Sequence, residues 1–268
     1  MIPNILTIAG SDPSGGAGIQ ADLKAISANG GYGMAAITAL TAQNTQGVRA
    51  VALTDPGMVA AQVAAIRDDI RIDAVKIGML GNAKIIEAVA DAVAGLMVPV
   101  VLDPVMVAKG GDRLLAADAV TALRDRLLPL ASVITPNLPE AADLLDAEEA
   151  TDRSAMAAQA AALLSLGPDA VLLKGGHLAG GDSPDLLLTP DGPRWFDGQR
   201  LATRNTHGTG CTLSSALATQ LGHGLTLPSA MAHAKTYIAT AIARSGDLTV
   251  GSGHGPVHHF HELHHKAS

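Results

Sequence analysis

The sequence predicts an α/β protein with a mostly parallel sheet that helices cover on both faces. Six short apolar runs lack polar alternation, and alanine-rich segments of helical period separate most of them. Strands that are apolar throughout and alternate with helices are typical of a parallel sheet buried on both sides. With 268 residues, 48% of them hydrophobic, the chain is long enough to bury one large core. A single domain over residues 1–268 is therefore expected.

The expected strands and helices follow one another in chain order. The apolar runs read as strands cover residues 5–9, 35–40, 74–77, 98–102, 133–135 and 170–173. Helical spacing is found, among other places, at residues 17–28, 58–70, 85–96, 116–128 and 156–166. Residues 48–53 and 186–196 differ from this pattern, and the second contains the turn signal Pro190-Asp191-Gly192. We expect both to be antiparallel additions or edge strands.

The composition excludes several classes of function. A net charge of −7 and an aromatic content of 2% provide neither the basic surface nor the stacking platform that nucleic-acid binding needs. No apolar run reaches membrane-spanning length, and no basic region precedes the first strand as it would in a signal peptide. The single cysteine excludes an internal disulfide and fits a reducing cytosol. We expect a cytoplasmic protein that binds neither nucleic acid nor membrane.

Residues 205–213 predict a glycine turn that opens a buried helix. Asn205 and Thr206 are good helix-capping residues, and apolar residues at helical spacing place the helix start near Gly208. The unpaired N–H groups and the dipole of such a helix start suit an anion. The dipole would also stabilise a thiolate at Cys211, which makes that residue a candidate base or nucleophile. A plain helix entry with a buried cysteine explains these nine residues equally well.

Charged and polar residues follow the later strands. Asp103 ends the fourth apolar run, Asn137 and Glu140 follow the fifth, and Lys174 ends the sixth. Ligands of such sheets bind beyond the carboxyl ends of the strands. Carboxylates and an amide suit a Mg²⁺ ion that keeps several waters, and a lysine suits nucleotide phosphates. Each residue alone would be an ordinary helix cap, but together with the anion-binding turn they are what phosphoryl transfer requires.

The first half of the chain offers groups for a small polar ligand. The glycine-rich loop 10–16 is not a P-loop, because no lysine follows its glycines. Ala17 comes next, and Asp22 stands in the first turns of the following helix, where a solvated carboxylate is the alternative interpretation. Gln43 stands at the end of the second run, and its amide can both donate to and accept from the edge of an aminopyrimidine. Met79 would give a flat ring an apolar wall, although core packing explains it equally well.

These motifs, in this order, resemble the hydroxymethylpyrimidine/phosphomethylpyrimidine kinases of thiamine biosynthesis, a branch of the ribokinase-like superfamily. The resemblance extends from Ile5 to about Phe260 and is carried by Ala9 to Asp22, Thr41 to Thr45, Lys76 to Leu80, Asp103 to Met106, Thr135 to Glu140, Lys174 to His177 and His207 to Thr212. It implies a three-layer αβα sandwich with a small antiparallel addition. It also implies ATP- and Mg²⁺-dependent phosphorylation of 4-amino-5-hydroxymethyl-2-methylpyrimidine and then of its monophosphate, commonly by a homodimer.

The resemblance also implies roles for individual residues. Gln43 would hold the pyrimidine edge in a pocket lined by Ala17, Asp22 and Met79. The phosphoryl group would lie among Gly208, Thr209, Gly210 and Cys211. Lys174, Asn137 and Thr206 would lie on the ATP side, and Asp103 and Glu140, with Asn137, would organise Mg²⁺. Sugar kinases of the superfamily have an aspartate base where Cys211 stands, so whether Cys211 is the general base stays open.

Other interpretations of the same residues stay open at this point. Within the kinases, the rival activity is phosphorylation of pyridoxal or pyridoxine, which have a similar shape. A cysteine hydrolase would use Cys211 with His207, but it would leave Asp103, Glu140 and Lys174 without a role. A catalytically silent pyrimidine sensor would need only the Gln43 side. The histidine-rich residues 255–265 are expected to be a docked terminal segment, with a zinc site as the lesser alternative.

Overall fold

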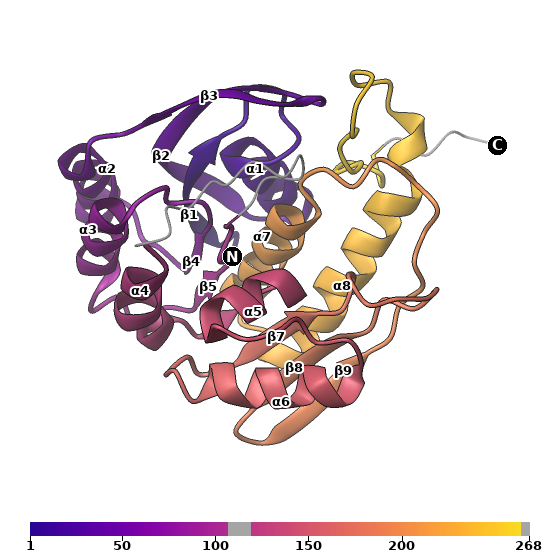
Figure 1. Ribbon diagram of the computed structural model, residues 1–268. Coiled ribbons are helices and arrows are strands. Elements are labelled where there is room, and N and C mark those ends of the chain that lie inside the picture. The colour runs from indigo at the N-terminus through magenta and orange to yellow at the C-terminus, as the bar shows by residue number, and fades with distance from the viewer. Residues whose placement is uncertain (107–118, 264–268) are drawn as a thin grey trace.

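The computed structural model describes residues 1–106 and 119–263 and has the expected three layers. A nine-stranded sheet, in the order β3-β2-β1-β4-β5-β6-β7-β8-β9, lies between two layers of helices (Figure 1). The six central strands are parallel: β2 (Tyr32–Asn44), β1 (Asn4–Ser11), β4 (Ala74–Ile77), β5 (Val100–Leu102), β6 (Val133–Ile134) and β7 (Val171–Lys174). Their carboxyl ends therefore meet at one edge of the sheet, as predicted.

The antiparallel pieces lie at the two ends of the sheet. β3 (Gly47–Leu53) pairs with β2, and the hairpin of β8 (Asp185–Thr189) and β9 (Gly192–Phe196) pairs with β7. Both antiparallel additions expected from the sequence are thus confirmed.

Helices cover each face because neighbouring strand residues point to opposite sides. Leu102 packs under one layer and Val101 under the other. The Leu102 layer consists of α2 (Pro56–Asp69), α3 (Ala83–Val93), α4 (Ala119–Ala122), α5 (Leu138–Leu145) and α6 (Arg153–Leu164). The Val101 layer consists of α1 (Gly18–Ala28), α7 (Thr209–Gly222) and α8 (Leu227–Ala243). None of the described helices combines the length and apolarity needed to cross a membrane.

Short irregular helices complete the layers. The expected helix 116–128 is found from Ala119 onward as α4 and a π-helical turn, Leu123–Leu127, which a 3₁₀ turn, Leu128–Leu130, follows. The part of that helix before Ala119 lies outside the described residues. A second 3₁₀ turn, Ser245–Asp247, follows α8.

The histidine-rich segment packs against α7 and α8, which confirms the expected docking. The Nε2 atom of His259 lies 3.0 Å from Oγ1 of Thr212, and the hydroxyl of Tyr237 donates to the carbonyl of His259 over 2.8 Å. Burial, with Lys24 and His258 nearby, lowers the pKa of His259 to about 3, so its imidazole is neutral at physiological pH. His264 and His265 lie outside the described residues.

A buried ion pair joins the sheet to the helices of the Val101 layer. The ammonium of Lys76 on β4 donates to both carboxylate oxygens of Asp22 on α1, over 2.9 Å each, and both side chains are completely buried. Thr7 on β1 donates to Oδ2 of Asp22 over 2.6 Å, and Ser215 on α7 donates to Oδ1 over 2.8 Å. Burial alone would lower the pKa of Lys76, but the charge of Asp22, with a smaller contribution from Asp103, outweighs it and raises that pKa.

We expect Asp22→Asn to destabilise the protein strongly, because it leaves the ammonium of Lys76 buried without a counter-charge. The free energy of unfolding, measured by urea denaturation, should fall by about 3–5 kcal/mol. The control is Asp91→Asn, which breaks the exposed pair with Arg126 and should cost at most about 1 kcal/mol. Equal losses in the two variants would contradict a structural role for the buried pair.

Candidate functional site

The start of α7 leaves backbone N–H groups available, as predicted. Gly208 is the N-cap, with a φ of 75°, and α7 begins at Thr209. Within the described part of the chain, the N–H groups of Gly210 and Cys211 have no hydrogen-bond acceptor, whereas that of Thr209 reaches the carbonyl of Thr206 over 3.3 Å. Unpaired amides at the positive end of a helix dipole attract an anion.

The expectation from the sequence that Asn205 or Thr206 caps α7 was wrong. No side chain caps α7, so neither Asn205 nor Thr206 has that role. The side chain of Asn205 instead donates to the carbonyl of Ser245 over 3.2 Å. Gly208 is the cap because a Cβ there would lie 1.8 Å from the carbonyl oxygen of Gly16, and its positive φ also favours glycine.

The anion-binding turn lies beside a lysine and a carboxylate from the sheet. A Cβ built on Gly210 would be 3.3 Å from Oδ2 of Asp103 and 3.4 Å from Nζ of Lys174. Lys174 donates to Oδ1 of Asp103 over 3.0 Å, and Thr135 donates to the same oxygen over 3.0 Å. The structure therefore brings together three elements that the sequence predicted separately: the ends of β5 and β7 and the start of α7.

Glu140 and Asn137 have a structural role at the start of α5. They form a capping box: the backbone N–H of Asn137 donates to Oε2 of Glu140, and the N–H of Glu140 donates to Oδ1 of Asn137, both over 2.8 Å. Burial raises the pKa of Glu140 to about 7, with Asp103 adding to the effect and Lys174 opposing it. Glu140 is thus a buried carboxyl close enough to Asp103 and Lys174 to respond to both charges.

Asp103 and Glu140 fit a magnesium ion that keeps several water ligands, and not one that is enclosed by protein ligands. Among the described residues, no three His, Cys, Asp or Glu side chains gather as a metal cluster. Mg²⁺ in phosphoryl-transfer sites uses one or two carboxylates, waters and substrate phosphates, so Asp103 and Glu140 would suffice. Their metal role, and contacts of Asn137 and Thr206 with ATP, stay predictions.

Cys211 is a neutral thiol, not the stabilised thiolate expected from the sequence. Burial raises its pKa to about 11; Asp22 and Asp103 add to this rise, and Lys76 and a hydrogen bond from the N–H of Gly18 oppose it. The prediction from the helix dipole was wrong because burial among carboxylates outweighs it. A hydrolase nucleophile needs a lowered pKa or a paired base, so this environment counts against the hydrolase interpretation.

The expected pyrimidine side gathers around Gln43 and the glycine-rich loop. Nε2 of Gln43 lies 3.5 Å from Nε2 of His207, next to the start of α7. Gly16 lies against the ring of His207, since a Cβ on Gly16 would be 2.3 Å from Cδ2 of that ring. Ala17, the next residue, therefore lies in the same region. Met79 lies beside the loop, since a Cβ on Gly10 would be 2.8 Å from its Cε, and its place in a substrate pocket stays a prediction.

Asp22 does not lie in that pocket, which corrects the expectation from the sequence. Its side chain is completely buried, and Lys76, Thr7 and Ser215 already occupy both carboxylate oxygens. The physical reason is the charge of Lys76: a buried ammonium requires a buried counter-ion.

Asp12 and His207 form a pair that the sequence did not predict, since His207 was considered only as the base of a hydrolase and Asp12 had no role. Oδ2 of Asp12 lies 2.8 Å from Nε2 of His207, although 195 positions separate the two residues. Asp12 precedes Pro13-Ser14-Gly15, a turn sequence, and this is the local signal that marks it. No local signal indicates its partner.

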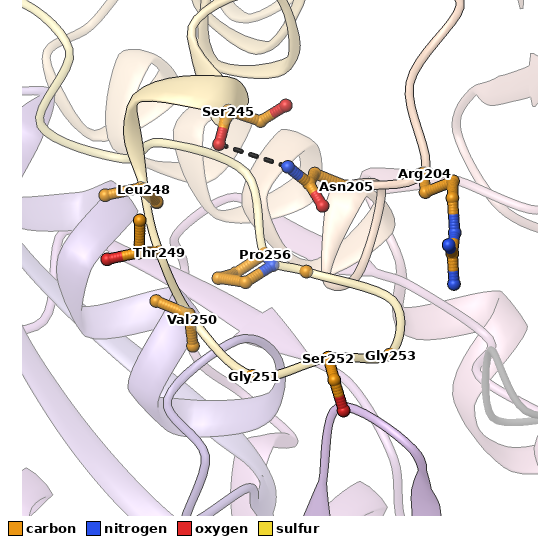
Figure 2. A pocket seen from close by; sticks show the side chains of 11 residues that line it. Arg204, Asn205, Ser245, Leu248, Thr249, Val250, Gly251, Ser252, Gly253 and Pro256 are labelled. Carbon is orange, nitrogen blue, oxygen red and sulfur yellow. Dashed lines mark hydrogen bonds between the residues drawn. The ribbon is translucent and has the colours of Figure 1, made fainter.

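An open pocket of about 170 Å³ lies next to this region (Figure 2). Arg204 and Asn205 line it on one side, and residues between Ser245 and Pro256 line the rest. Figure 2 shows Asn205 turned toward Ser245, to which it is hydrogen-bonded. None of the predicted catalytic, substrate or metal residues lines this pocket, so it borders the loop before α7 without containing the chemistry.

Comparisons with known proteins show the family to which the chain belongs. The family model of phosphomethylpyrimidine kinase matches residues 12–258. The chain is 54% identical to the hydroxymethylpyrimidine/phosphomethylpyrimidine kinase of Escherichia coli (strain K12), over 96% of this chain and 97% of that protein.

Two solved structures share the fold. The ADP complex of Bacillus subtilis pyridoxal kinase has a TM-score of 0.90 and 37% identity, with 98% of this chain and 100% of that chain covered. The phosphomethylpyrimidine kinase of Clostridium difficile 630 has a TM-score of 0.80 and 41% identity, with 90% and 99% covered. The ribokinase-like α/β fold is thus confirmed, and the chain belongs to the phosphomethylpyrimidine kinase family.

Proposed function

We propose that this protein transfers the γ-phosphoryl group of ATP to the hydroxymethyl group of 4-amino-5-hydroxymethyl-2-methylpyrimidine, and then a second phosphoryl group to the resulting monophosphate. The observation that carries the proposal is the position of the unpaired amides of Gly210 and Cys211, beside Lys174 and Asp103. Fixed donors at the place where phosphoryl charge develops are the main catalytic requirement of this reaction. A relative named for this activity is 54% identical over nearly the whole chain.

Different residues of the chain have different roles in this proposed reaction. The Gln43 amide orients the aminopyrimidine, with Ala17 and Met79 beside it, and the start of α7 holds the phosphoryl oxygens. Lys174 draws the phosphates toward Asp103 and Glu140. Mg²⁺, held by these two carboxylates, would shield the phosphate charge. The single cysteine supports a reducing compartment, and we propose the cytoplasm.

The direct test is incubation with the hydroxymethylpyrimidine and Mg-ATP, followed by mass spectrometry. We expect the pyrimidine to gain one phosphate and then a second, with ADP formed in equal amount. Because a pyridoxal kinase shares the fold at a TM-score of 0.90, pyridoxal is the matched comparison. A higher kcat/KM for pyridoxal would favour the alternative kinase, and no phosphorylation of either compound would contradict both.

We expect kcat to rise with pH if the Cys211 thiolate takes the hydroxymethyl proton. The pKa of about 11 leaves the thiol protonated at neutral pH, so the thiolate fraction grows about tenfold per pH unit between pH 7 and 9. Cys211→Ala should lower kcat by about a hundredfold and make its pH profile flat. A flat profile in the native enzyme, with little loss in the variant, would reduce Cys211 to a packing residue.

We also propose that the protein is a homodimer that pairs through the β3 end of the sheet. β3 is an edge strand whose residues from Arg49 to Leu53 are all exposed, including Val51 and Leu53. Leu40 on β2 and Met58 on α2 add exposed apolar surface. An uncovered apolar edge strand is a template for pairing with another chain.

Light scattering after size exclusion should therefore give twice the chain mass of 27.1 kDa. Val51→Lys should shift the mass toward that of one chain, because it places a charge on the proposed contact. Met97→Lys alters an even more exposed apolar residue, in the loop after α3, and should leave the dimer intact. A single-chain mass for the native protein at every concentration would disprove this assembly.

A further inference from the structure

Asp12 fastens the glycine-rich loop to the turn before α7. Oδ1 of its carboxylate accepts from the N–H and the hydroxyl of Ser14, over 2.8 and 2.7 Å, and Oδ2 accepts from the N–H of Ala17 over 2.9 Å. Oδ2 also lies 2.8 Å from Nε2 of His207. The side chains of Asp12 and His207 are only 3% and 9% exposed, so water competes little for this bond.

The two segments also touch through their glycines. The ring of His207 occupies the place of a side chain on Gly16, and the carbonyl oxygen of Gly16 occupies the place of a side chain on Gly208. Gly18, the first residue of α1, lies near Cys211, since its backbone N–H helps to lower the pKa of that thiol. The loop on the pyrimidine side and the turn on the phosphoryl side thus form one packed unit.

The bond to Asp12 determines what His207 can offer Gln43. A carboxylate only accepts, so Nε2 of His207 carries the shared hydrogen and cannot accept from the amide nitrogen of Gln43, 3.5 Å away. The oxygen end of the Gln43 amide is also available. The hydroxyl of Thr41 can donate only one hydrogen bond, and its oxygen lies closer to the carbonyl oxygen of Ser11 (2.9 Å) than to Oε1 of Gln43 (3.2 Å). Both ends of the Gln43 amide therefore stay available to a ligand.

We propose that Asp12 and His207 are a positioning pair that keeps the Gln43 amide free for the pyrimidine and holds the alcohol in register with the phosphoryl site at the start of α7. This inference rests on the proposed function and deepens it. Neither residue touches the reacting atoms; each acts through Gln43 and the glycine-rich loop.

The test compares KM for the pyrimidine with KM for ATP in full-length variants. Asp12→Asn and His207→Ala should each raise KM for the pyrimidine by about tenfold, the effect of one hydrogen bond to a charged group, and change KM for ATP little. His207→Gln, whose amide can still donate to Asp12, should restore most of the lost affinity. Lys24→Met removes another bond to the same loop, from Lys24 to the carbonyl of Gly15, and should stay close to native.

A double-mutant cycle with Gln43→Ala separates positioning from general loosening. In the Gln43→Ala background, Asp12→Asn should weaken calorimetric binding of the pyrimidine no further. Additive losses, equal increases in KM for both substrates, or a failure of His207→Gln to restore affinity would overturn the proposal.

The link that Asp12 and His207 form between the glycine-rich loop and the turn before α7 can be tested without measuring catalysis. Hydrogen exchange in Asp12→Asn should quicken both in residues 13–18 and in residues 207–210, while Lys24→Met should affect the loop alone. Quickened exchange confined to the loop in Asp12→Asn would also overturn the proposal. If the native enzyme phosphorylates no pyrimidine, the proposed function fails, whatever the exchange result.

Discussion

The ion pair between Lys76 and Asp22 is the contact on which the arrangement of the site depends. It lies beneath the start of α7 and joins β4 to α1, while Thr7 and Ser215 connect the same carboxylate to β1 and α7. The four elements that meet there supply or support both halves of the site. A Cβ on Gly78 would lie 2.7 Å from Nζ of Lys76, so the chain uses glycine where the ammonium needs room. The buried charge is internally balanced, so this ion pair adds no net charge to the site.

The position of α7 explains how one helix start lies close to both groups of expected site residues. α7 packs on β1, β4 and β5, the middle of the sheet. β2 and β1 carry Gln43 and the glycine-rich loop, and β5 and β7 carry Asp103 and Lys174 at their ends. Because parallel strands end at the same edge, a central helix that begins at that edge is within reach of both sets. The fold thereby places the residues expected on the pyrimidine side and those expected on the ATP side around a single group of amides.

The parts of this arrangement that could be predicted from sequence are those with local signals. Uninterrupted apolar runs predicted the strands. Glycines followed by apolar residues at helical spacing predicted that α7 starts near Gly208. Asp22 and Cys211 were misjudged because their properties depend on Lys76 and Asp103, which come from distant strands. The bond between Asp12 and His207 was missed for the same reason, since 195 residues separate its partners. Burial and long-range pairing decide charge and orientation, and a sequence read segment by segment does not contain them.

The docked segment near the C-terminus has a consequence for how the enzyme is made. Pro256 bridges to His207, and His259 contacts Thr212, so this segment fastens the anion-binding turn on both sides. During synthesis, which proceeds from the N-terminus, Gln43, Asp103 and Lys174 leave the ribosome long before Pro256 and His259 do. The nascent protein can therefore build its sheet during translation, but it matures into a working catalyst only after this segment has been released from the exit tunnel.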